Sequence, residues 1–333
     1  MNSLDTSNEL VLSNPFGSCR AYVSAGLTAD IYKGLLDADT GLGVRVITDS
    51  SAIQEQVEAV RVCWGAARWS LIYLTHPEID YNSLPDMAVA KDLRTFAVLG
   101  PAKIGSVMGT AYGIRAFHKI SGDWLGMHSS AIYDNQTGLV HIITGKASSG
   151  KSSCAFLLEH RNPQRYAVLG DEWTEVSLVS NRVRQISPVC GLPSHKQAQD
   201  AVLANPRYVY AFSSFGKKWY SIRRASSSER DNYQLGGVFQ LDAREKTDNS
   251  VYILRKINSH IPFMNTDLAQ IPVLGLDVKE ARRIRASVVG RVTRILNGYQ
   301  GLAERANYHI LDANDGDMMR VAIIIQGLIE SQK

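Results

Sequence analysis

The chain has 333 residues, of which 45% are hydrophobic and 20% are charged. This length suits one large domain or two domains with cores of their own, and the composition is that of a globular protein rather than a disordered or fibrous one. The net charge of +4 is too small to argue for nucleic acid, so no nucleic-acid partner is expected.

Signals for a membrane or for secretion are missing from the sequence. No run of about 18 apolar residues occurs, so no membrane span is expected. The start, MNSLDTSNELVLSNPFG, is polar and acidic before it is apolar, which is not the order of a secretory signal. The cysteines, which form no C-x-x-C pair, are Cys19, Cys63, Cys154 and Cys190. Neither disulfides nor a thiolate zinc site are expected, and a cytoplasmic location fits best.

Residues 1–120 read as a mixed α/β domain. Strands are predicted at 42–49, 68–75 and 92–100, where apolar and β-branched residues gather. A helix is predicted at 50–67, because serine stands at its start and glutamate follows soon after. Nothing in this region carries a pattern that points to a particular chemistry.

Residues 121–333 read as a second domain. The stretch LGMHSSAIYDNQTGLVHIITG (125–145) predicts two strands joined by a turn. A helix is predicted at 151–160, and two strands flank Gly-Asp-Glu within 165–179. Further along, 236–244 and 250–257 predict an antiparallel pair.

Two more helices are predicted towards the C-terminus. The segment KEARRIRASVVGRVTR (279–294) has apolar residues at helical spacing, which favours an amphipathic helix whose arginines face solvent over an anion-binding face. The tail DMMRVAIIIQGLIES predicts a helix that packs on the sheet.

The sharpest motif is a phosphate-binding loop between a predicted strand and a predicted helix. Its glycines, lysine and serine fit G-x-x-x-x-G-K-[ST], a pattern in which backbone amides point at an anion. The following helix adds its positive N-terminal end, the lysine reaches the β- and γ-phosphates, and the serine hydroxyl ligates Mg²⁺. The predicted nucleotide-binding residues are Gly145, Lys146, Ala147, Ser148, Ser149, Gly150, Lys151, Ser152 and Ser153.

An acidic pair follows at the end of the next hydrophobic run. Asp171 and Glu172 stand where sites of α/β sheets are found, at a strand terminus. One carboxylate could hold the metal, directly or through water, and the other could accept the proton of an attacking hydroxyl.

Three motifs in order, MHSSA (127–131), TGKASSGKSS (144–153) and LGDEW (169–173), resemble those of phosphoenolpyruvate carboxykinases. That family carries M-H-C-S-A, then G-L-S-G-T-G-K-T, then G-D-D-E-H. The HPr kinase/phosphorylase family is similar in plan, with a histidine ahead of G-x-S-G-x-G-K-S and a D-D pair after the helix. The resemblance covers about residues 125–180 and implies a P-loop kinase core with a mixed, largely antiparallel sheet.

The resemblance also implies a role for each matching residue. Lys151 and Ser152 match the phosphate lysine and the magnesium hydroxyl, while Asp171 and Glu172 match the two acids. His128 matches the metal-ligand histidine of the carboxykinases. The implied catalytic residues are Asp171, Lys151 and His128, and the implied metal ligands are Ser152, Asp171, Glu172 and His128. Because a neutral imidazole suits Mn²⁺ better than Mg²⁺, Mn²⁺ joins the expected metals.

The sequence departs from both families on the acceptor side. Ala147 and Ser148 stand where the family loop has Ser-Gly, and ISPVCGLPSHKQ (186–197) occupies the approximate place of a substrate segment. Candidate cations for the acceptor lie in 194–196, in 215–224 and at Arg255. Within 215–224, Lys217 and Lys218 follow a glycine, as in a loop that closes over a substrate.

The expected function is an ATP-dependent kinase that transfers the γ-phosphoryl group to a hydroxyl of a small metabolite or of a peptide or protein side chain. A carboxykinase-type lyase and a nucleotide-binding regulator with slow or no ATP hydrolysis are the alternatives. The identity of the acceptor, ATP against GTP as donor, and a homo-oligomeric state stay open.

Overall fold

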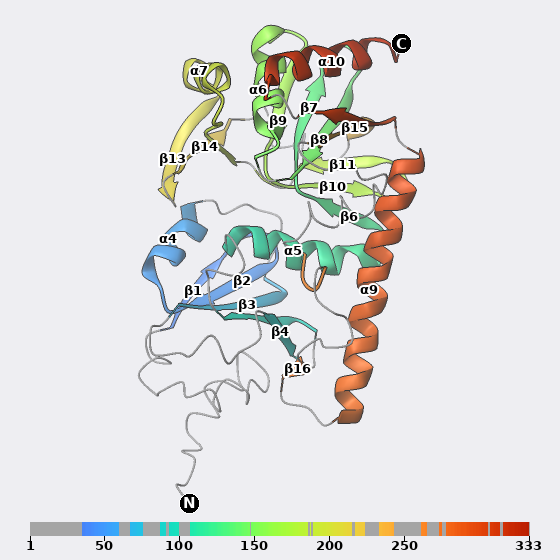
Figure 1. Cartoon of the computed structure of the whole chain (residues 1–333). Coiled ribbons are helices and arrows are strands. Elements are labelled where there is room, and N and C mark those ends of the chain that lie inside the picture. Colours follow the sequence, from blue (N-terminus) through green and yellow to red (C-terminus); the bar gives the residue numbers. More distant parts are fainter. Residues whose placement is uncertain are drawn as a thin grey trace, which may run out of the picture. The chain divides into compact units, whose positions relative to one another are not determined.

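The computed structural model describes residues 35–59, 67–75, 87–90, 93–99, 107–146, 148–185, 187, 189–214, 217–223, 233–242, 261–264, 273–274, 278–305, 307–313 and 316–332. The chain forms two compact units, one made of residues up to Phe117 with 260–293, the other of 118–259 with the residues from Arg294 onward. Each unit combines helices with a sheet of parallel and antiparallel pairs (Figure 1), so the predicted α/β class is confirmed.

The first unit contains a mixed sheet in the order β1-β2-β3-β5-β4-β16. Its central strands β2, β3 and β5 run parallel, and β1 and β4 join them antiparallel. The predicted strands at 42–49, 68–75 and 92–100 correspond to β2, β3 and β5. The bounds are β1 Leu36–Asp39, β2 Val44–Thr48, β3 Trp69–Leu74, β4 Met87–Ala90, β5 Thr95–Leu99 and β16 Val273–Leu274.

Two helices belong to this unit, α4 (Ser51–Ala59) and α5 (Val107–Lys119, whose last two residues fall in the second unit). The carbonyl of Ser50 accepts the amide of Gln54 at 3.1 Å, so α4 starts where predicted, while 60–66 lie outside the described residues. The Phe117 ring of α5 meets the Phe96 ring edge to face, with centroids 5.6 Å apart.

Residues 260–293 cluster with the first unit, although the sequence placed them with the second domain. Phe263 lies 6.4 Å from Phe96 and 6.5 Å from Phe117, measured between ring centroids. This aromatic cluster joins segments far apart in the chain, a contact that local patterns do not reveal.

The second unit contains a larger mixed sheet in the order β6-β10-β11-β15-β8-β7-β9, with β17 paired to β15. Most neighbours are antiparallel, but β15 runs parallel to both β8 and β17. The bounds are β6 Trp124–Met127, β7 Ser129–Asp134, β8 Leu139–Gly145, β9 Tyr166–Gly170, β10 Thr174–Ser177, β11 Arg182–Gln185, β15 Tyr233–Asp242 and β17 Tyr308–Asp312.

The predicted strands of the central region correspond to β7, β8, β9 and β10. The predicted strand at 236–244 overlaps β15, and its proposed partner at 250–257 lies outside the described residues. Strand β15 pairs with β8 over residues 234–241, which places a strand from late in the chain beside the one that leads into the loop at 145–150.

Helices α6 (Lys151–Arg161) and α10 (Met318–Glu330) pack together in the second unit (Figure 1). Their shared core includes Phe156, Leu157, Val321 and Ile325, all buried. A smaller sheet of β12 (Val189–Gly191), β14 (Lys217–Ile222) and β13 (Tyr208–Ser214) joins the same core, as does α7 (Lys196–Ala204).

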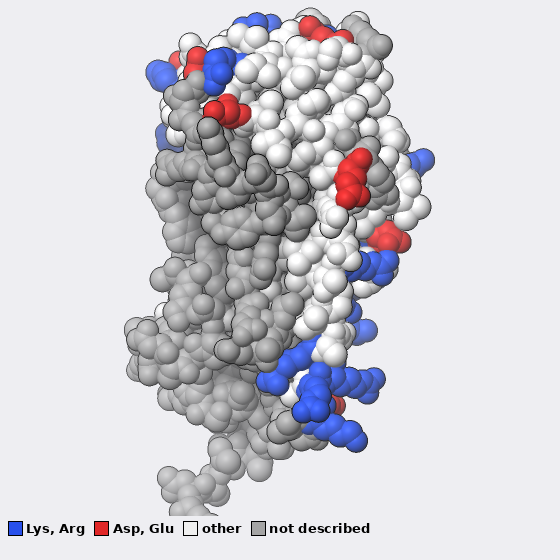
Figure 2. All heavy atoms as spheres, turned by 45° about the vertical axis from the view of Figure 1, so that its right-hand side comes forward, with Lys and Arg blue, Asp and Glu red and all other residues white. Residues whose placement is uncertain are grey.

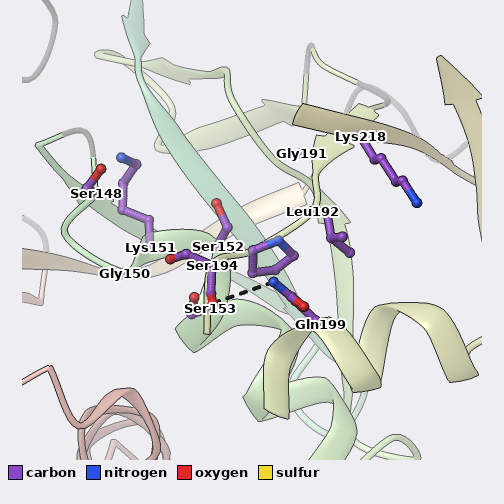
Figure 3. Close-up of a pocket in the computed structure, with 11 residues that line it drawn as sticks. Ser148, Gly150, Lys151, Ser152, Ser153, Gly191, Leu192, Ser194, Gln199 and Lys218 are labelled. Carbon is purple, nitrogen blue, oxygen red and sulfur yellow. Dashed lines mark hydrogen bonds between the residues drawn. The ribbon is translucent and has the colours of Figure 1, made fainter. Parts of the chain in front are cut away.

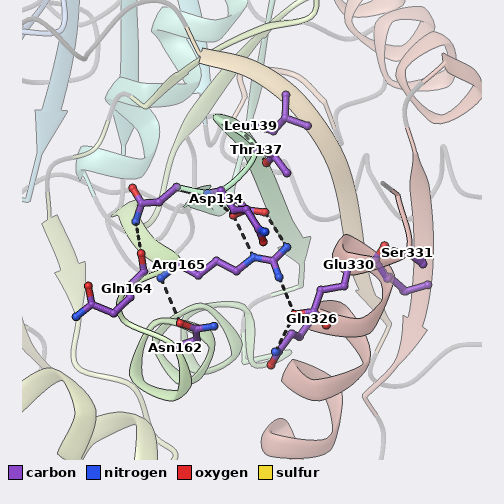
Figure 4. Close-up of polar contacts among 12 residues, drawn as sticks. Asp134, Thr137, Leu139, Asn162, Gln164, Arg165, Gln326, Glu330 and Ser331 are labelled. Carbon is purple, nitrogen blue, oxygen red and sulfur yellow. Dashed lines mark hydrogen bonds and ion pairs between the residues drawn. The ribbon is translucent and has the colours of Figure 1, made fainter.

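The turn between β7 and β8 is fixed by an ion-pair network (Figure 4). The Arg165 guanidinium donates Nε and Nη2 to the Asp134 carboxylate at 3.1 Å each, and its Nη1 reaches Glu330 at the end of α10 at 2.7 Å. This network therefore holds a sheet turn and the end of a helix together.

The long helix α9 (Val278–Arg305) confirms the amphipathic helix predicted at 279–294. Val288 and Val292 are buried while Arg282 and Arg283 are exposed, and Figure 2 shows Lys and Arg side chains gathered near the start of this helix. Arg291 differs, because its guanidinium stacks 5.0 Å from the Phe117 ring centroid and burial lowers its pKa. None of the described helices is both apolar enough and long enough for a membrane crossing.

Candidate active site

The sheet of the second unit brings the predicted site residues to one edge. Strands β8 and β9 are both antiparallel to β7, so they run parallel to each other on either side of it. The loop after β8, the acids after β9 and the residues at the start of β7 therefore share an edge. Carboxyl ends of strands are where α/β sheets place their ligands.

The loop at 145–150 has the backbone that a phosphate-binding turn requires. Ser148 and Gly150 adopt left-handed conformations, with φ of 62° and 92°. Gly145 has no room for a side chain, since a Cβ atom there would lie 2.8 Å from the carbonyl oxygen of Leu241 on β15. Gly150 then serves as the N-cap of α6 without a capping side chain, so the first turn offers its amides to an anion. Ala147 lies outside the described residues.

Lys151 is folded back over this loop. Its side chain is buried, and its Nζ atom donates to the carbonyl oxygen of Lys146 at 3.0 Å. The positive charge is thereby held at the loop. In general, a lysine ammonium can bind a phosphate as a point charge.

Asp171 is joined directly to the first turn of α6. Its carboxylate accepts the Ser152 hydroxyl at 2.8 Å and, on the other oxygen, the hydroxyl of Ser130. Only 2% of the residue is exposed. Ser152 and Asp171 therefore form a direct polar contact, although they lie nineteen positions apart in the chain.

Ser130 is a site residue that the sequence patterns did not single out. It is the second residue of β7 and lies two positions after His128, which comes just before the strand. The motif MHSSA gave no signal that singled it out, because Ser129 and Ser130 are the same residue type, yet Ser129 contacts Thr174 while Ser130 contacts Asp171.

His128 and Glu172 form a second pair at the same edge. The His128 Nε2 atom lies 3.3 Å from a Glu172 carboxylate oxygen, and the two side chains are 14% and 26% exposed. Glu172 has a left-handed backbone, with φ of 76°. The structure thus brings all the predicted metal-site residues to one edge but sorts them into two contacts, Asp171 with Ser152 and Glu172 with His128.

The loop opens onto a pocket of about 520 Å³ (Figure 3). One wall is the loop and the first turn of α6, including Lys151, Ser152 and Ser153. The sequence predicted part of the opposite wall, because Ser194 and Lys218 belong to segments that were expected to supply cations for the acceptor. Arg255 and the Lys217 side chain, which were also candidates, lie outside the described residues. This opposite wall is formed by Gly191, Leu192, Pro193, Ser194, Gln199 and Lys218.

The donors present suit a hard cation. In the described part of the chain, no group of three or more His, Cys, Asp or Glu side chains gathers for a metal. Mg²⁺ does not need such a cage, since it binds through one or two carboxylates, waters and substrate phosphates. The Ser152 hydroxyl and the Asp171 carboxylate, in contact at 2.8 Å, are oxygen donors of this kind.

The two cysteines in the described residues take no part in this site. Among the described residues, Cys154 and Cys190 form no disulfide and are buried, and burial raises the pKa of the Cys154 thiol to about 12. The Cys154 thiol therefore stays protonated, and both side chains lie in the hydrophobic core.

Comparison with known proteins adds no relative to this picture. No family model matches the sequence, and no curated protein matches it. The functional conclusion rests on the residues and their geometry.

Proposed function

We propose that the protein is an ATP-dependent phosphotransferase that moves the γ-phosphoryl group to a hydroxyl acceptor. The observation that carries the proposal is the contact between Ser152 and Asp171 at 2.8 Å. It joins the hydroxyl next to the loop lysine to a buried carboxylate at the end of a parallel strand. A phosphate-binding turn with this pairing has what phosphoryl transfer requires, an anion cradle and an adjoining acid.

On this proposal the triphosphate lies along the loop. The backbone amides at the start of α6 and the ammonium of Lys151 would hold the β- and γ-phosphates. Ser152 and Asp171 would hold Mg²⁺, which when bound neutralises charge on the outer phosphate oxygens. The sequence resemblance to the HPr kinase and carboxykinase families supports the same assignment.

The transfer step is an in-line displacement. The acceptor oxygen forms the new bond to the γ-phosphorus, the bond from that phosphorus to its bridging oxygen breaks, and ADP leaves with the electron pair. The proton of the acceptor hydroxyl passes to a carboxylate, for which Asp171 is our candidate. Asp171 already accepts two hydroxyl hydrogen bonds, so an alcohol is a partner that this carboxylate can bind.

His128 and Glu172 lie beside this centre. Their contact at 3.3 Å orients the imidazole towards an acid, an arrangement that supports a role in positioning a ligand or a second metal. Mn²⁺ is the proposed metal there, because imidazole nitrogen suits it better than Mg²⁺.

Phosphoryl transfer can be tested with radiolabelled nucleotide. The protein is incubated with [γ-³²P]ATP, Mg²⁺ and panels of alcohols, hydroxy acids and serine-containing peptides, and the label is located. We expect label on an acceptor, and we expect Asp171→Asn to slow its transfer about 10²–10⁴-fold. The matched control is Asp200→Asn, which changes an acid on α7 that is 55% exposed and paired with Lys196.

Other outcomes would identify the alternatives. Label that appears only in inorganic phosphate, whatever hydroxyl compound is added, would indicate a slow ATPase with a regulatory role. Conversion of oxaloacetate and ATP into phosphoenolpyruvate and CO₂ would indicate the lyase. Either result would replace the kinase proposal.

A further inference from the structure

The pocket beyond the phosphate-binding loop has the size of a small-molecule site. Its volume of about 520 Å³ falls within the range of roughly 300–1,000 Å³ that is typical of ligand pockets. It lies beside the loop, whereas peptides are often bound along an extended groove or a sheet edge. Because the loop forms one wall of this pocket, the outer phosphates would take up part of its volume, and the space that remains suits a small molecule as acceptor.

The lining that the structure describes is positively charged. It contains Lys151 and Lys218, several hydroxyls and one amide, and among these described lining residues there is neither an acidic nor an aromatic side chain. Such a lining complements anions and offers no aromatic ring to a nucleobase.

The two lysines lie at opposite ends of the pocket. Figure 3 shows Lys151 beside Ser148 at one end and Lys218 at the other, with Leu192 and Ser194 between. Lys218 belongs to β14, and its carbonyl accepts the amide of Leu192 at 2.8 Å. The segment that lines the pocket is thereby tied to the strand that carries the second cation.

Among the residues that the structure describes, no acid neutralises the charge of Lys218. Its side chain is exposed, and within the described residues no carboxylate forms an ion pair with it. Lys196 shows the contrast, since its ammonium pairs with Asp200 at 2.5 Å on the same side of the unit. The phosphates already have Lys151 and the helix amides, and a nucleobase carries no charge for Lys218 to balance.

We infer that the acceptor is a small hydroxy compound with an anionic group of its own, a carboxylate or a phosphate, and that Lys218 holds this group. The inference rests on the proposed phosphotransfer. Anchoring the anion at the far end of the pocket places the acceptor between Lys218 and the γ-phosphate, with its hydroxyl towards the phosphorus. The bonds formed and broken are those of the in-line displacement described above.

The inference is tested by anion binding to nucleotide-loaded protein. The loop is first saturated with Mg²⁺ and the non-hydrolysable analogue AMP-PNP, and inorganic phosphate and acetate are then titrated separately by calorimetry. We expect at least one of the two to bind, and we expect Lys218→Gln to weaken it about tenfold or more, the effect of losing a charged hydrogen-bond donor. Lys218→Arg keeps the charge and should retain binding.

Controls separate this inference from the proposed function. Lys196→Gln removes an exposed lysine that does not line the pocket and should leave anion and AMP-PNP binding unchanged. Failure of the wild-type protein to bind AMP-PNP would refute the nucleotide site itself. If AMP-PNP binds but neither anion does, the acceptor inference alone is overturned. The same holds if Lys218→Gln weakens the binding of AMP-PNP and not that of the anion. Preference for phosphate over acetate, or the reverse, identifies the anionic group.

Discussion

At the scale of single residues, Gly145 shows most directly why the loop sequence is constrained. A Cβ atom at this position would lie 2.4 Å from the Ser149 Oγ atom and 2.8 Å from the Leu241 carbonyl oxygen. The serine can rotate, but the carbonyl belongs to the neighbouring strand β15 and cannot move without disturbing the sheet. We therefore expect Gly145→Ala to lower the free energy of unfolding in urea by about 1–3 kcal/mol.

A glycine in a different setting provides the control. Gly290 is exposed within α9, and a Cβ atom there would have nothing within 4 Å. Gly290→Ala should raise the free energy of unfolding by about 0.5–1 kcal/mol, because alanine loses less backbone entropy in a helix. If Gly145→Ala unfolded at the same urea concentration as the wild type, the expected clash between a side chain at position 145 and β15 would be contradicted.

His141 on β8 predicts a pH dependence of stability. Burial lowers the pKa of its imidazole from 6.5 to about 4, against the opposing charge of Asp134 and with the help of Arg165. Neither ring nitrogen has a hydrogen-bond partner among the described residues. As the pH falls below 6.5, the unfolded chain takes up a proton at this histidine while the folded protein does not, so stability decreases until about pH 4.

The size of this effect follows from the shift. Each pKa unit corresponds to about 1.4 kcal/mol, so the full loss is about 3 kcal/mol. Urea unfolding at pH 7 and at pH 4.5 should show the wild type losing more stability than His141→Gln, which has no imidazole to protonate. Equal losses in both proteins would show that His141 is accessible to protons in the folded state.

At the scale of elements, Arg165 joins the turn between β7 and β8 to the end of α10. The Asp134 carboxylate that it binds is fully buried. Burial raises the pKa of this carboxyl, but hydrogen bonds from Arg165 and Gln136 outweigh it, so the pKa lies below its usual 3.8. Arg165→Met should lower the free energy of unfolding by about 3–5 kcal/mol, because it leaves a buried charge without its partner.

An exposed ion pair is the control for the effect of burial on the stability that an ion pair contributes. Arg294 reaches Asp123 at 2.6 Å, but the two side chains are 51% and 40% exposed. Arg294→Met should therefore change the free energy of unfolding by no more than about 1 kcal/mol in the same assay. Equal effects of the two substitutions would mean that burial of Asp134 does not matter.

The elements of the second unit were largely predictable, but their neighbours were not. Hydrophobic alternation and turn residues predicted β7 and β8, and the loop glycines with the following apolar face predicted α6, because these signals are local. The pairing of β15 with β8 joins residues that are about a hundred positions apart. The Met318 side chain that would meet a Cβ atom at Gly150 comes from still further along the chain. Such contacts follow from packing of the whole unit.

At the scale of the whole molecule, the sequence predicted one half of the site better than the other. The loop and the acids match a motif of fixed chemistry, so residue type and order were enough to predict Lys151, Ser152 and Asp171 as candidate residues, and the structure brings Ser152 and Asp171 into contact. The opposite wall of the pocket has no such motif. Gly191 and Gln199 line the pocket only because β12, α7 and β14 fold beside α6.

The most direct test of the central claim is equilibrium binding of a fluorescent, non-hydrolysable ATP analogue in the presence of Mg²⁺. The wild-type protein should bind it, and Lys151→Ala should weaken binding about tenfold or more, since a charged hydrogen bond to phosphate is lost. Lys196→Ala, which alters a lysine that is 80% exposed on α7, should bind like the wild type. Equal affinity of all three proteins, or no binding by the wild type, would contradict the claim that the turn at 145–152 holds a nucleotide's phosphates.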